Sequence, residues 1–241
     1  MRAMILAAGK GTRLRPVTDT VPKPLLEVAG RPMIAFPLAV LCAAGIQEVV
    51  INLHHLGTQI RDGLGDGSDY GVRITYSEEE PILDTGGALA AARELLSGDT
   101  FAVLNADTVI DLALQDVIAF HRRQRAMATM VVRPDHDALR KDAIGVDAAH
   151  RLRCILGHPA GIEPGGFPAG RLMYAGVIIF EPRVFDYLPR GVYSITRDVY
   201  PRLLDAGEPL YGYVHRGYWR VLDTPDDLAA GRRELAAGTF S

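Results

Sequence analysis

The sequence predicts an α/β fold in which a mixed, mostly parallel sheet carries helices on both faces. Strand-like runs alternate with helical patterns through the first 132 residues, as they do in proteins built on parallel sheets. The first run, residues 3–7, is apolar throughout, as expected of a strand that is buried on both faces. Hydrophobic residues make up 48% and charged residues 23% of the 241 residues, which is the composition of an ordinary globular chain.

The first part of the chain follows this alternation closely. After the strand at 3–7, apolar residues at helical spacing predict a helix at 32–44, and Gly45 follows it as a typical helix stop. Residues 65–68 are expected to form a loop. Further strands are expected at 48–53, 72–76, 100–104 and 128–132, and further helices at 55–64, 85–96 and 114–123.

After about residue 133 the pattern changes: two short strands come first, then a glycine- and proline-rich loop and a longer strand. Thr224 precedes Pro225 and two acidic residues, which is a typical helix start. Strands are expected at 144–146, 152–155, 173–180, 210–214 and 219–222, a loop at 163–170, and a helix at 195–204 capped by Thr196 or Ser194. We interpret residues 1–241 as one domain with two parts, 1–132 and 133–241.

Composition and charge exclude several classes of protein. A formal net charge of −3 gives no sign of a surface for nucleic acid or for an anionic membrane. No apolar stretch approaches the roughly 20 residues that span a bilayer, and the N-terminus lacks the features of a signal peptide, so we expect a cytoplasmic protein. Cys42 and Cys154 lie far apart in apolar surroundings, which predicts buried thiols instead of a disulfide or metal site.

A glycine-rich loop follows the first strand. Ligands of open α/β sheets bind beyond the carboxyl ends of the strands, and small residues let backbone N–H groups approach a polyphosphate. Arg13 can hold a phosphate through two hydrogen bonds and Thr12 can donate its hydroxyl. Lys23 lies between two prolines that fix the direction of the chain. Neither a dinucleotide-binding fingerprint nor a P-loop has this spacing, and a turn without a ligand is the alternative for the loop alone.

The full stretch LAAGKGTRLRPVTDTVPKPL, residues 6–25, resembles the signature of the sugar-1-phosphate nucleotidyltransferases, GxGTRLxPxT followed by PKP. DTGGA at 84–88 and NAD at 105–107 are similar to two further motifs of that family. The resemblance covers most of the chain. It implies a Rossmann-like three-layer sandwich of the nucleotide-diphospho-sugar transferase type, and residues 1–241 as one catalytic domain with a nucleotide-binding half at 1–132 and a sugar-binding half at 133–241.

The resemblance also implies an activity. Enzymes of this family transfer a nucleoside monophosphate from an NTP to a sugar 1-phosphate and release pyrophosphate, a reaction of NDP-sugar and cell-envelope polysaccharide biosynthesis. NTP and sugar 1-phosphate are thus the expected partners, and Mg²⁺ the expected cofactor. The compact form resembles the N-acetylmuramic acid 1-phosphate uridylyltransferases and the heptose-1-phosphate guanylyltransferases, which favours UTP first and GTP next. We expect a monomer or a homodimer.

Roles for individual residues follow from the matched motifs. The catalytic residues are expected to be Arg13, Lys23 and Asp107, of which Asp107 also binds Mg²⁺. Expected nucleotide contacts are Leu6, Ala8, Gly9, Gly11, Thr12, Arg13, Thr85, Gly86, Gly87 and Asn105. Expected sugar contacts are Gly145, Glu163, Gly176 and Arg197.

The chain departs from the family pattern in two places. The family often carries Glu-Lys-Pro, whose charged residues contact the sugar and its phosphate, but this chain has Gly-His-Pro at 157–159. His158 is one candidate to replace the missing contacts, and Arg171 and Arg197 are candidates to replace the lysine. The family motif W-x-D-[IV]-G-T-P supplies a second metal ligand, and its Asp position holds Val221 here. Asp223 lies about 6–7 Å further along the same strand face. Asp223 is therefore either the metal ligand, if the strand end bends inward, or a helix cap.

Two other functions remain open on the sequence. The lost motif residues are compatible with a non-catalytic, regulatory subunit that binds nucleotide sugars. They are also compatible with a CTP-dependent transferase that acts on a phosphocholine-like or phosphonate-like acceptor. The presence of Arg13, Lys23 and Asp107 together argues for catalysis, because binding alone would not need all three.

Overall fold

The chain divides into two compact units in the computed structural model, which describes residues 1–135 and 143–238. Unit 1 comprises 1–82, 103–114 and 217–241, and unit 2 comprises 83–102 and 115–216. The expected boundary at residue 132 lies inside unit 2, and each unit takes residues from both sides of it.

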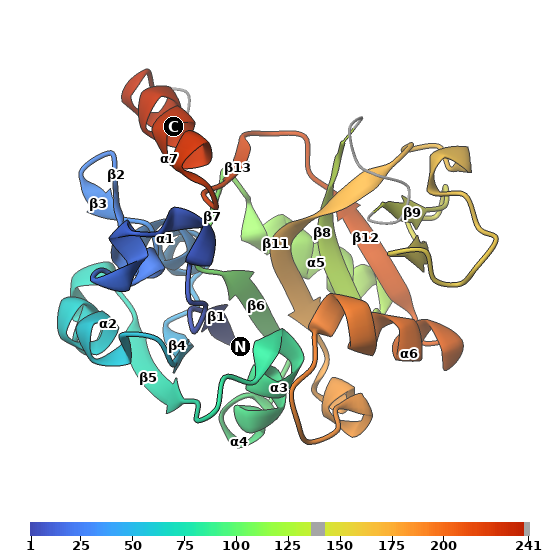
Figure 1. Ribbon diagram of the computed structural model, residues 1–241. Coiled ribbons are helices and arrows are strands. Elements are labelled where there is room, and N and C mark those ends of the chain that lie inside the picture. Colours follow the sequence, from blue (N-terminus) through green and yellow to red (C-terminus); the bar gives the residue numbers. More distant parts are fainter. Residues whose placement is uncertain (136–142, 239–241) are drawn as a thin grey trace. The chain divides into compact units, whose positions relative to one another are not determined.

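Unit 1 is built on parallel strands. Strand β1 pairs in parallel with β4, and β4 pairs in parallel with β5. Met4 and Ile5 are fully buried in β1, as the continuous apolar run predicts for a strand covered on both faces. The strands of this sheet follow one another from the centre of Figure 1 to its lower left in the order β6 (Phe101–Asn105, from residue 103), β1 (Arg2–Leu6), β4 (Glu48–Leu53) and β5 (Arg73–Glu78).

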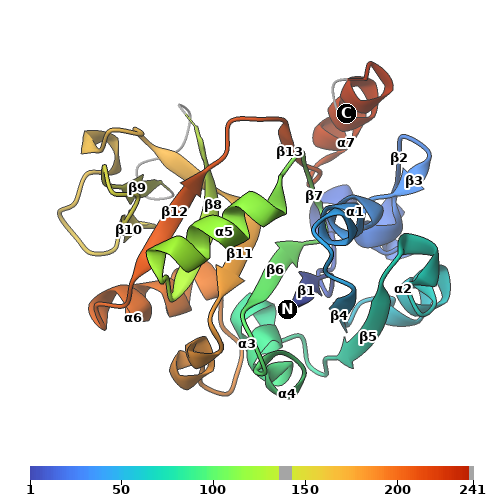
Figure 2. The same cartoon turned by 180° about the vertical axis from the view of Figure 1, so that it is seen from behind.

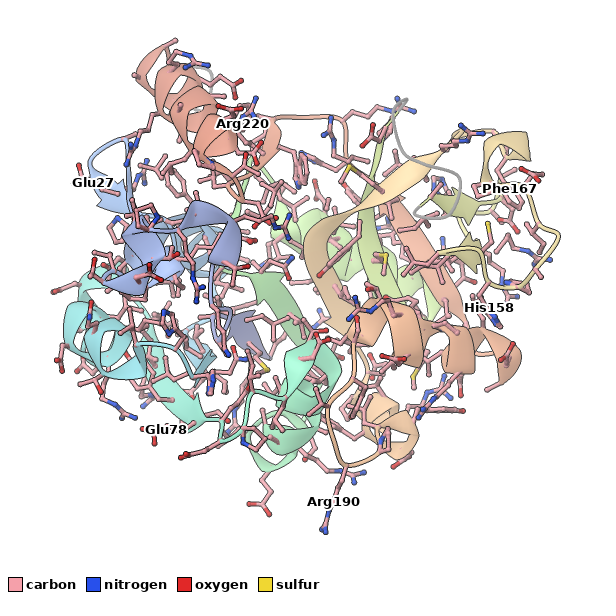
Figure 3. All side chains as sticks on the ribbon, in the orientation of Figure 1. Glu27, Glu78, His158, Phe167, Arg190 and Arg220 are labelled. Carbon is pink, nitrogen blue, oxygen red and sulfur yellow. The ribbon has the colours of Figure 1, made fainter. Side chains whose placement is uncertain are left out.

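Unit 1 also contains two short strand pairs and, among its described residues, three α-helices. The strand pairs are β2 (Glu27–Val28) with β3 (Arg31–Pro32), and β7 (Thr108–Ile110) with β13 (Trp219–Val221). The helices are α1 (Ala35–Ala43), α2 (Gly57–Leu64) and α7 (Pro225–Ala236). In Figure 3, Glu27 marks the β2–β3 hairpin, and Arg220 of β13 lies beside α7, where its guanidinium donates to Glu234.

Helix α1 begins three residues later than its apolar spacing predicts. Ala29 and Gly30 both have positive φ, as in two-residue hairpin turns, and the turn pairs Glu27 with Pro32. Because its backbone belongs to the hairpin ladder, Pro32 cannot start the helix.

One of the two cysteines contradicts its prediction. Cys154 is buried, but Cys42 is exposed, and both are free thiols. Ala39, Cys42 and Ala43 are the exposed residues at the end of α1. Their spacing of three and four places them on one side of the helix. Cys42 therefore faces solvent although the residues around it in the sequence are apolar.

Unit 2 contains a mixed sheet in which β9 and β10 are short, as predicted for 144–146 and 152–155, and β11 is long. Strand β12 pairs in parallel with β8, whereas β8 with β11 and β9 with β10 are antiparallel. Figures 1 and 2 show α5 on one face of this sheet and α6 on the other. Its strands lie in the order β10 (Leu152–Ile155), β9 (Ile144–Val146), β11 (Leu172–Phe180), β8 (Ala128–Pro134) and β12 (Leu210–Val214).

The helices of unit 2 differ in detail from their predictions. The helix expected at 85–96 is divided at Ala92 into two helices, and the helix expected at 195–204 starts with a π-helical turn. Ser194, not Thr196, is its N-cap and accepts a hydrogen bond from the backbone N–H of Arg197. The α-helices are α3 (Asp84–Ala91), α4 (Arg93–Leu96), α5 (Leu114–Gln124) and α6 (Tyr200–Asp205), the last of which follows the π-turn (Ile195–Val199).

The parallel strands of unit 1 and the mixed strands of unit 2, each with their helices, confirm the predicted α/β class. The short strands β2, β3 and β7 were not among the expected elements. No helix in the described ranges 1–135 and 143–238 has both the length and the apolar character that a membrane crossing requires.

Candidate functional site

A cavity of about 230 Å³ opens in unit 1 at the carboxyl ends of β1 and β6. Complete ligand pockets commonly measure about 300–1,000 Å³, so this cavity is suited to part of a ligand. Its walls come from the glycine-rich loop, the PKP segment and the chain beyond β6. The lining residues are Leu6, Ala7, Gly9, Gly11, Thr12, Arg13, Lys23, Pro24, Ala106, Asp107 and Asp223.

Gly11 determines the course of the loop. Its φ of 60° lies in the left-handed region, which glycine adopts without steric cost. A Cβ atom at this position would lie 2.9 Å from Cγ2 of Thr18 and 3.1 Å from Cβ of Lys23. The buried Thr18 hydroxyl donates to the Gly11 carbonyl oxygen at 2.8 Å. The glycine is therefore required by the packing of the loop on Thr18 and Lys23.

Two buried polar residues that the sequence analysis missed hold the start of the loop. The backbone N–H of Ala7 donates to Oδ1 of Asn52 at 2.7 Å, and Nδ2 of Asn52 donates to Oε1 of Glu79 at 2.7 Å. Asn52 and Glu79 are 4% and 5% exposed. This chain of hydrogen bonds joins the carboxyl ends of β1, β4 and β5. No sequence motif predicts this network, because Asn52 is a single polar residue within an otherwise apolar run.

The cavity contains a cluster of four charged side chains. Nζ of Lys23 donates to Oδ2 of Asp107 at 2.5 Å and to Oδ1 of Asp223 at 2.9 Å. The second oxygen of Asp223 forms an ion pair with Arg13. The Lys23 side chain is 9% exposed, compared with 26% for Asp107 and 22% for Asp223. A cation buried to this degree needs charged partners, and the two carboxylates supply them.

Strand β13 brings Asp223 to this cluster. The strand ends at Val221, which pairs with Thr108 of β7. The next residue, Leu222, donates its backbone N–H to the carbonyl oxygen of Asp107 at 2.9 Å. Asp223 therefore lies beyond the end of the strand, where side chains no longer alternate between its two faces. Its carboxylate reaches Lys23.

The alternative in which Asp223 caps the following helix is wrong. Thr224 is the N-cap of α7, and its side chain accepts a hydrogen bond from the backbone N–H of Asp227. The Asp227 carboxylate in turn accepts from the Thr224 backbone N–H, which completes a capping box. The cap leaves both oxygens of Asp223 to Lys23 and Arg13.

Carboxylates are the side chains of the cluster that suit a metal ion. Within the described part of the chain, no group of three or more histidine, cysteine, aspartate or glutamate side chains is arranged to hold a metal. Mg²⁺, however, commonly binds through one or two carboxylates together with substrate phosphates and water. Asp107 and Asp223 approach the same Lys23 nitrogen, so one small cation could reach both.

The DTGGA motif lies in unit 2 and is tied to the segment before α6. Asp84 has a φ of 57° and accepts from the Thr85 backbone N–H and from Arg197 at 2.9 Å. The backbone N–H of Gly86 donates to the Tyr193 carbonyl oxygen at 2.8 Å, and a Cβ at Gly86 would lie 2.4 Å from the Tyr193 ring. A Cβ at Gly87 would lie 2.2 Å from the carbonyl oxygen of Gly191. Both glycines are thus required by close packing within the chain, and their contact with a nucleotide stays a prediction.

The expected sugar contacts also lie in unit 2. A Cβ at Gly145 would lie 2.5 Å from the Phe167 ring, so packing requires this glycine too. Gly176 has a φ of 88° within β11, where the register against β8 shifts. Glu163 is exposed at the start of a short 3₁₀ turn. His158, labelled in Figure 3, lies 2.8 Å from Asp205 through its Nε2.

Among the expected site residues of unit 1, the structure brings most to one cavity. Ala8 and Asn105 belong to the same unit without lining the cavity. Ala7, Pro24 and Ala106 line it and were not expected; each is a sequence neighbour of an expected residue. Those of the expected residues that line the cavity are Leu6, Gly9, Gly11, Thr12, Arg13, Lys23, Asp107 and Asp223.

A buried histidine in unit 2 also escaped the sequence analysis. His121 is 1% exposed, with Nδ1 at 2.9 Å from the Thr129 hydroxyl and Nε2 at 3.1 Å from Oε1 of Glu181. Burial lowers the pKa of His121 below its ordinary value, and the hydrogen bond that the ring donates to Glu181 opposes this shift in part. The hydroxyl of Thr100 donates to the same Glu181 oxygen at 2.8 Å.

Comparison with known proteins shows the family. The family model of the nucleotidyl transferases matches residues 2–238. N-acetylmuramate alpha-1-phosphate uridylyltransferase of Neisseria meningitidis serogroup B is 40% identical over 229 residues, which cover 93% of this chain and 94% of that protein. Mannose-1-phosphate guanylyltransferase of Mycobacterium tuberculosis is 36% identical over 238 residues, which cover 98% of this chain but 65% of that protein. The chain thus spans about two thirds of the length of this second relative.

A solved structure agrees on the fold. HddC from Yersinia pseudotuberculosis superimposes with a TM-score of 0.80 at 22% identity, covering 97% of this chain and 99% of that chain. The chain therefore belongs to the nucleotidyl transferase family and, with these relatives, to its sugar-1-phosphate nucleotidyltransferases.

Proposed function

We propose that this chain transfers a nucleoside monophosphate from an NTP to a sugar 1-phosphate and releases pyrophosphate. The observation that carries the proposal is the charged cluster of unit 1. There Lys23, Asp107 and Asp223 meet in a cavity whose rim includes Arg13 and the glycine-rich loop. Both reactants are anionic, so positioning and charge neutralisation are the tasks that catalysis requires.

Each residue of the cavity has a proposed task. Backbone N–H groups at Gly11 and Thr12, with the Arg13 guanidinium, hold the β- and γ-phosphates that leave as pyrophosphate. Lys23 stabilises charge at the α-phosphate. An oxygen of the sugar phosphate forms a bond to the α-phosphorus as the bond from that phosphorus to the leaving pyrophosphate breaks. Contacts of Leu6, Ala8, Gly9 and Asn105 with the nucleoside, and of Thr85, Gly86 and Gly87 with the base, belong to the same proposal.

The carboxylate pair fits a divalent metal. Asp107 and Asp223 offer hard oxygen donors on the wall of the cavity where phosphates would bind. We propose that these two residues hold Mg²⁺, which when bound neutralises phosphate charge and polarises the α-phosphate. Asp223 then takes the place of the aspartate that Val221 replaces in the family motif.

The sugar side of the proposal rests on residues of unit 2. Gly145, Glu163 and Gly176 are proposed to contact the sugar, and Arg197 its phosphate. Arg197 is 69% exposed and holds Asp84, so its guanidinium is available for exchange with an incoming anion. The proposal favours UTP over GTP. The names of the relatives include both uridylyl- and guanylyltransferases, so the base is a question for experiment.

A pyrophosphate-release assay tests the proposal. The protein is incubated with Mg²⁺, each of UTP, GTP, CTP, dTTP and ATP, and a panel of acceptors that includes phosphocholine and the 1-phosphates of N-acetylmuramic acid, mannose, glucose and heptose. We expect turnover with at least one pair, and its loss in Asp107→Asn. Nucleotide binding without turnover on any acceptor would instead indicate a regulatory subunit. Turnover confined to CTP with phosphocholine would instead indicate a CTP-dependent transferase for phosphocholine-like acceptors. Cytoplasmic location and a monomeric or dimeric state stay predictions.

A further inference from the structure

We propose that Lys23 competes with the divalent metal for the two carboxylates, so that metal binds strongly only together with the triphosphate. This inference rests on the proposed function, because it assigns Asp107 and Asp223 to the metal and Lys23 to a phosphate. It goes beyond that function in stating an order of events: the metal and the nucleotide enter as a unit, and the lysine changes partners when they arrive.

The position of the Lys23 nitrogen supports competition. Nζ lies 2.5 Å from an oxygen of Asp107 and 2.9 Å from an oxygen of Asp223. Mg²⁺ bonds oxygen at about 2.0–2.1 Å. A cation shared by these two oxygens would therefore occupy nearly the same space as the ammonium group. The metal and the lysine cannot both hold the carboxylate pair in this arrangement.

Because Lys23 is buried, its ammonium group needs an anionic partner at every stage of the exchange between lysine and metal. Two carboxylates face Lys23 and Arg13, so the formal charges of the cluster cancel. A metal ion that entered alone would leave the Lys23 ammonium, 9% exposed, without its partners, which is costly for a buried charge. A triphosphate supplies new anionic partners to Lys23 and Arg13 while the metal takes the carboxylates. After the exchange every cation of the cluster therefore still has an anionic partner.

Linkage turns this exchange into a measurable coupling. A side chain that blocks the metal in the free protein lowers metal affinity, and nucleotide binding removes that block. Removal of the lysine should therefore strengthen metal binding to the free protein and weaken nucleotide binding. A lysine that acted only on the α-phosphate would not change metal affinity in the absence of nucleotide.

The test measures Mn²⁺ binding to the full chain without nucleotide, from the electron paramagnetic resonance signal of free Mn²⁺. We expect Lys23→Met to bind Mn²⁺ about tenfold more tightly than the wild type, and the added Asp223→Asn change to abolish the gain. Lys23→Ala provides a second variant in case the methionine prevents folding, which circular dichroism reports. Arg61→Met is the matched control, because it removes a cation from the exposed Arg61–Glu78 pair of the same unit and should leave Mn²⁺ affinity unchanged.

Two results would overturn the inference: a gain below threefold in the folded Lys23 variants, or a gain that survives Asp223→Asn. These results are independent of turnover. A wild type that is active while its Lys23 variants gain no metal affinity refutes the inference alone. A protein without turnover whose Lys23 variants gain metal affinity refutes the proposed function alone.

Discussion

Replacement of Gly11 by alanine should destabilise unit 1 by an amount that the structure allows us to work out. The φ of 60° at Gly11 costs an L-residue about 1–2 kcal/mol. The added Cβ would lie 2.9 Å from Cγ2 of Thr18, and overpacking of this kind costs about 1–3 kcal/mol. Thr18 cannot rotate away freely, because it is fully buried and its hydroxyl holds the Gly11 carbonyl oxygen. We expect a loss of about 2–5 kcal/mol in the free energy of unfolding.

Gly9→Ala is the matched control. Gly9 belongs to the same loop, but its φ lies outside the left-handed range and a Cβ there would meet no atom within 4 Å. Its effect on stability should stay within about 0.5 kcal/mol, as for other unstrained surface changes. Because Gly9 lines the cavity, the same change should raise the KM for NTP.

Urea denaturation followed by circular dichroism measures both variants against the wild type. Gly11→Ala should lower the urea midpoint, and Gly9→Ala should not. Equal stabilities of the two variants would show that the strain at Gly11 is relieved by movement of the loop, and would refute the argument from Thr18.

Three further predictions concern other parts of the molecule. Lys23→Ala should lower kcat at least tenfold, about 1.4 kcal/mol or more of transition-state stabilisation; a near-normal rate in the pyrophosphate assay would remove its assigned role. Thr224→Ala removes the N-cap of α7 and should cost about 1 kcal/mol of stability in urea, whereas Asp223→Asn should not disturb this cap. The buried His121, whose pKa is lowered from 6.5, should make stability fall as the pH drops below 6.5, since the unfolded chain then binds a proton that the folded chain resists. His121→Gln should remove that part of the decrease between pH 7.5 and 5.5, measured as unfolding free energies; an unchanged pH profile would contradict the assignment.

Local patterns were enough to predict most of the regular structure. The strands at 48–53, 144–146, 152–155 and 210–214 have the bounds expected from their apolar runs. Thr224, Pro225 and the acids after them predicted the start of α7. Such signals lie within a few neighbouring residues, because helix caps and strand burial depend on local hydrogen bonds and on the period of the side chains.

Other features depended on which segments pack together. The apolar segment around Cys42 predicted a buried thiol, but Cys42 lies on the solvent face of α1. The bounds of α1 depended on a hairpin that occupies Pro32. Asn52 with Glu79 in unit 1, and His121 with Glu181 in unit 2, became visible as networks only when the strands were in place.

The sequence by itself determined the α/β class and the family resemblance, and it predicted Lys23 and Asp107 as site residues. Only the tertiary structure decided the position of Asp223, for which strand alternation and helix capping gave two different answers. Lys23 and Asp223 are 200 residues apart in the chain, and their contact at 2.9 Å exists because β13 pairs with β7 and ends at Val221. A contact of this kind depends on the pairing of distant strands, which no local pattern encodes.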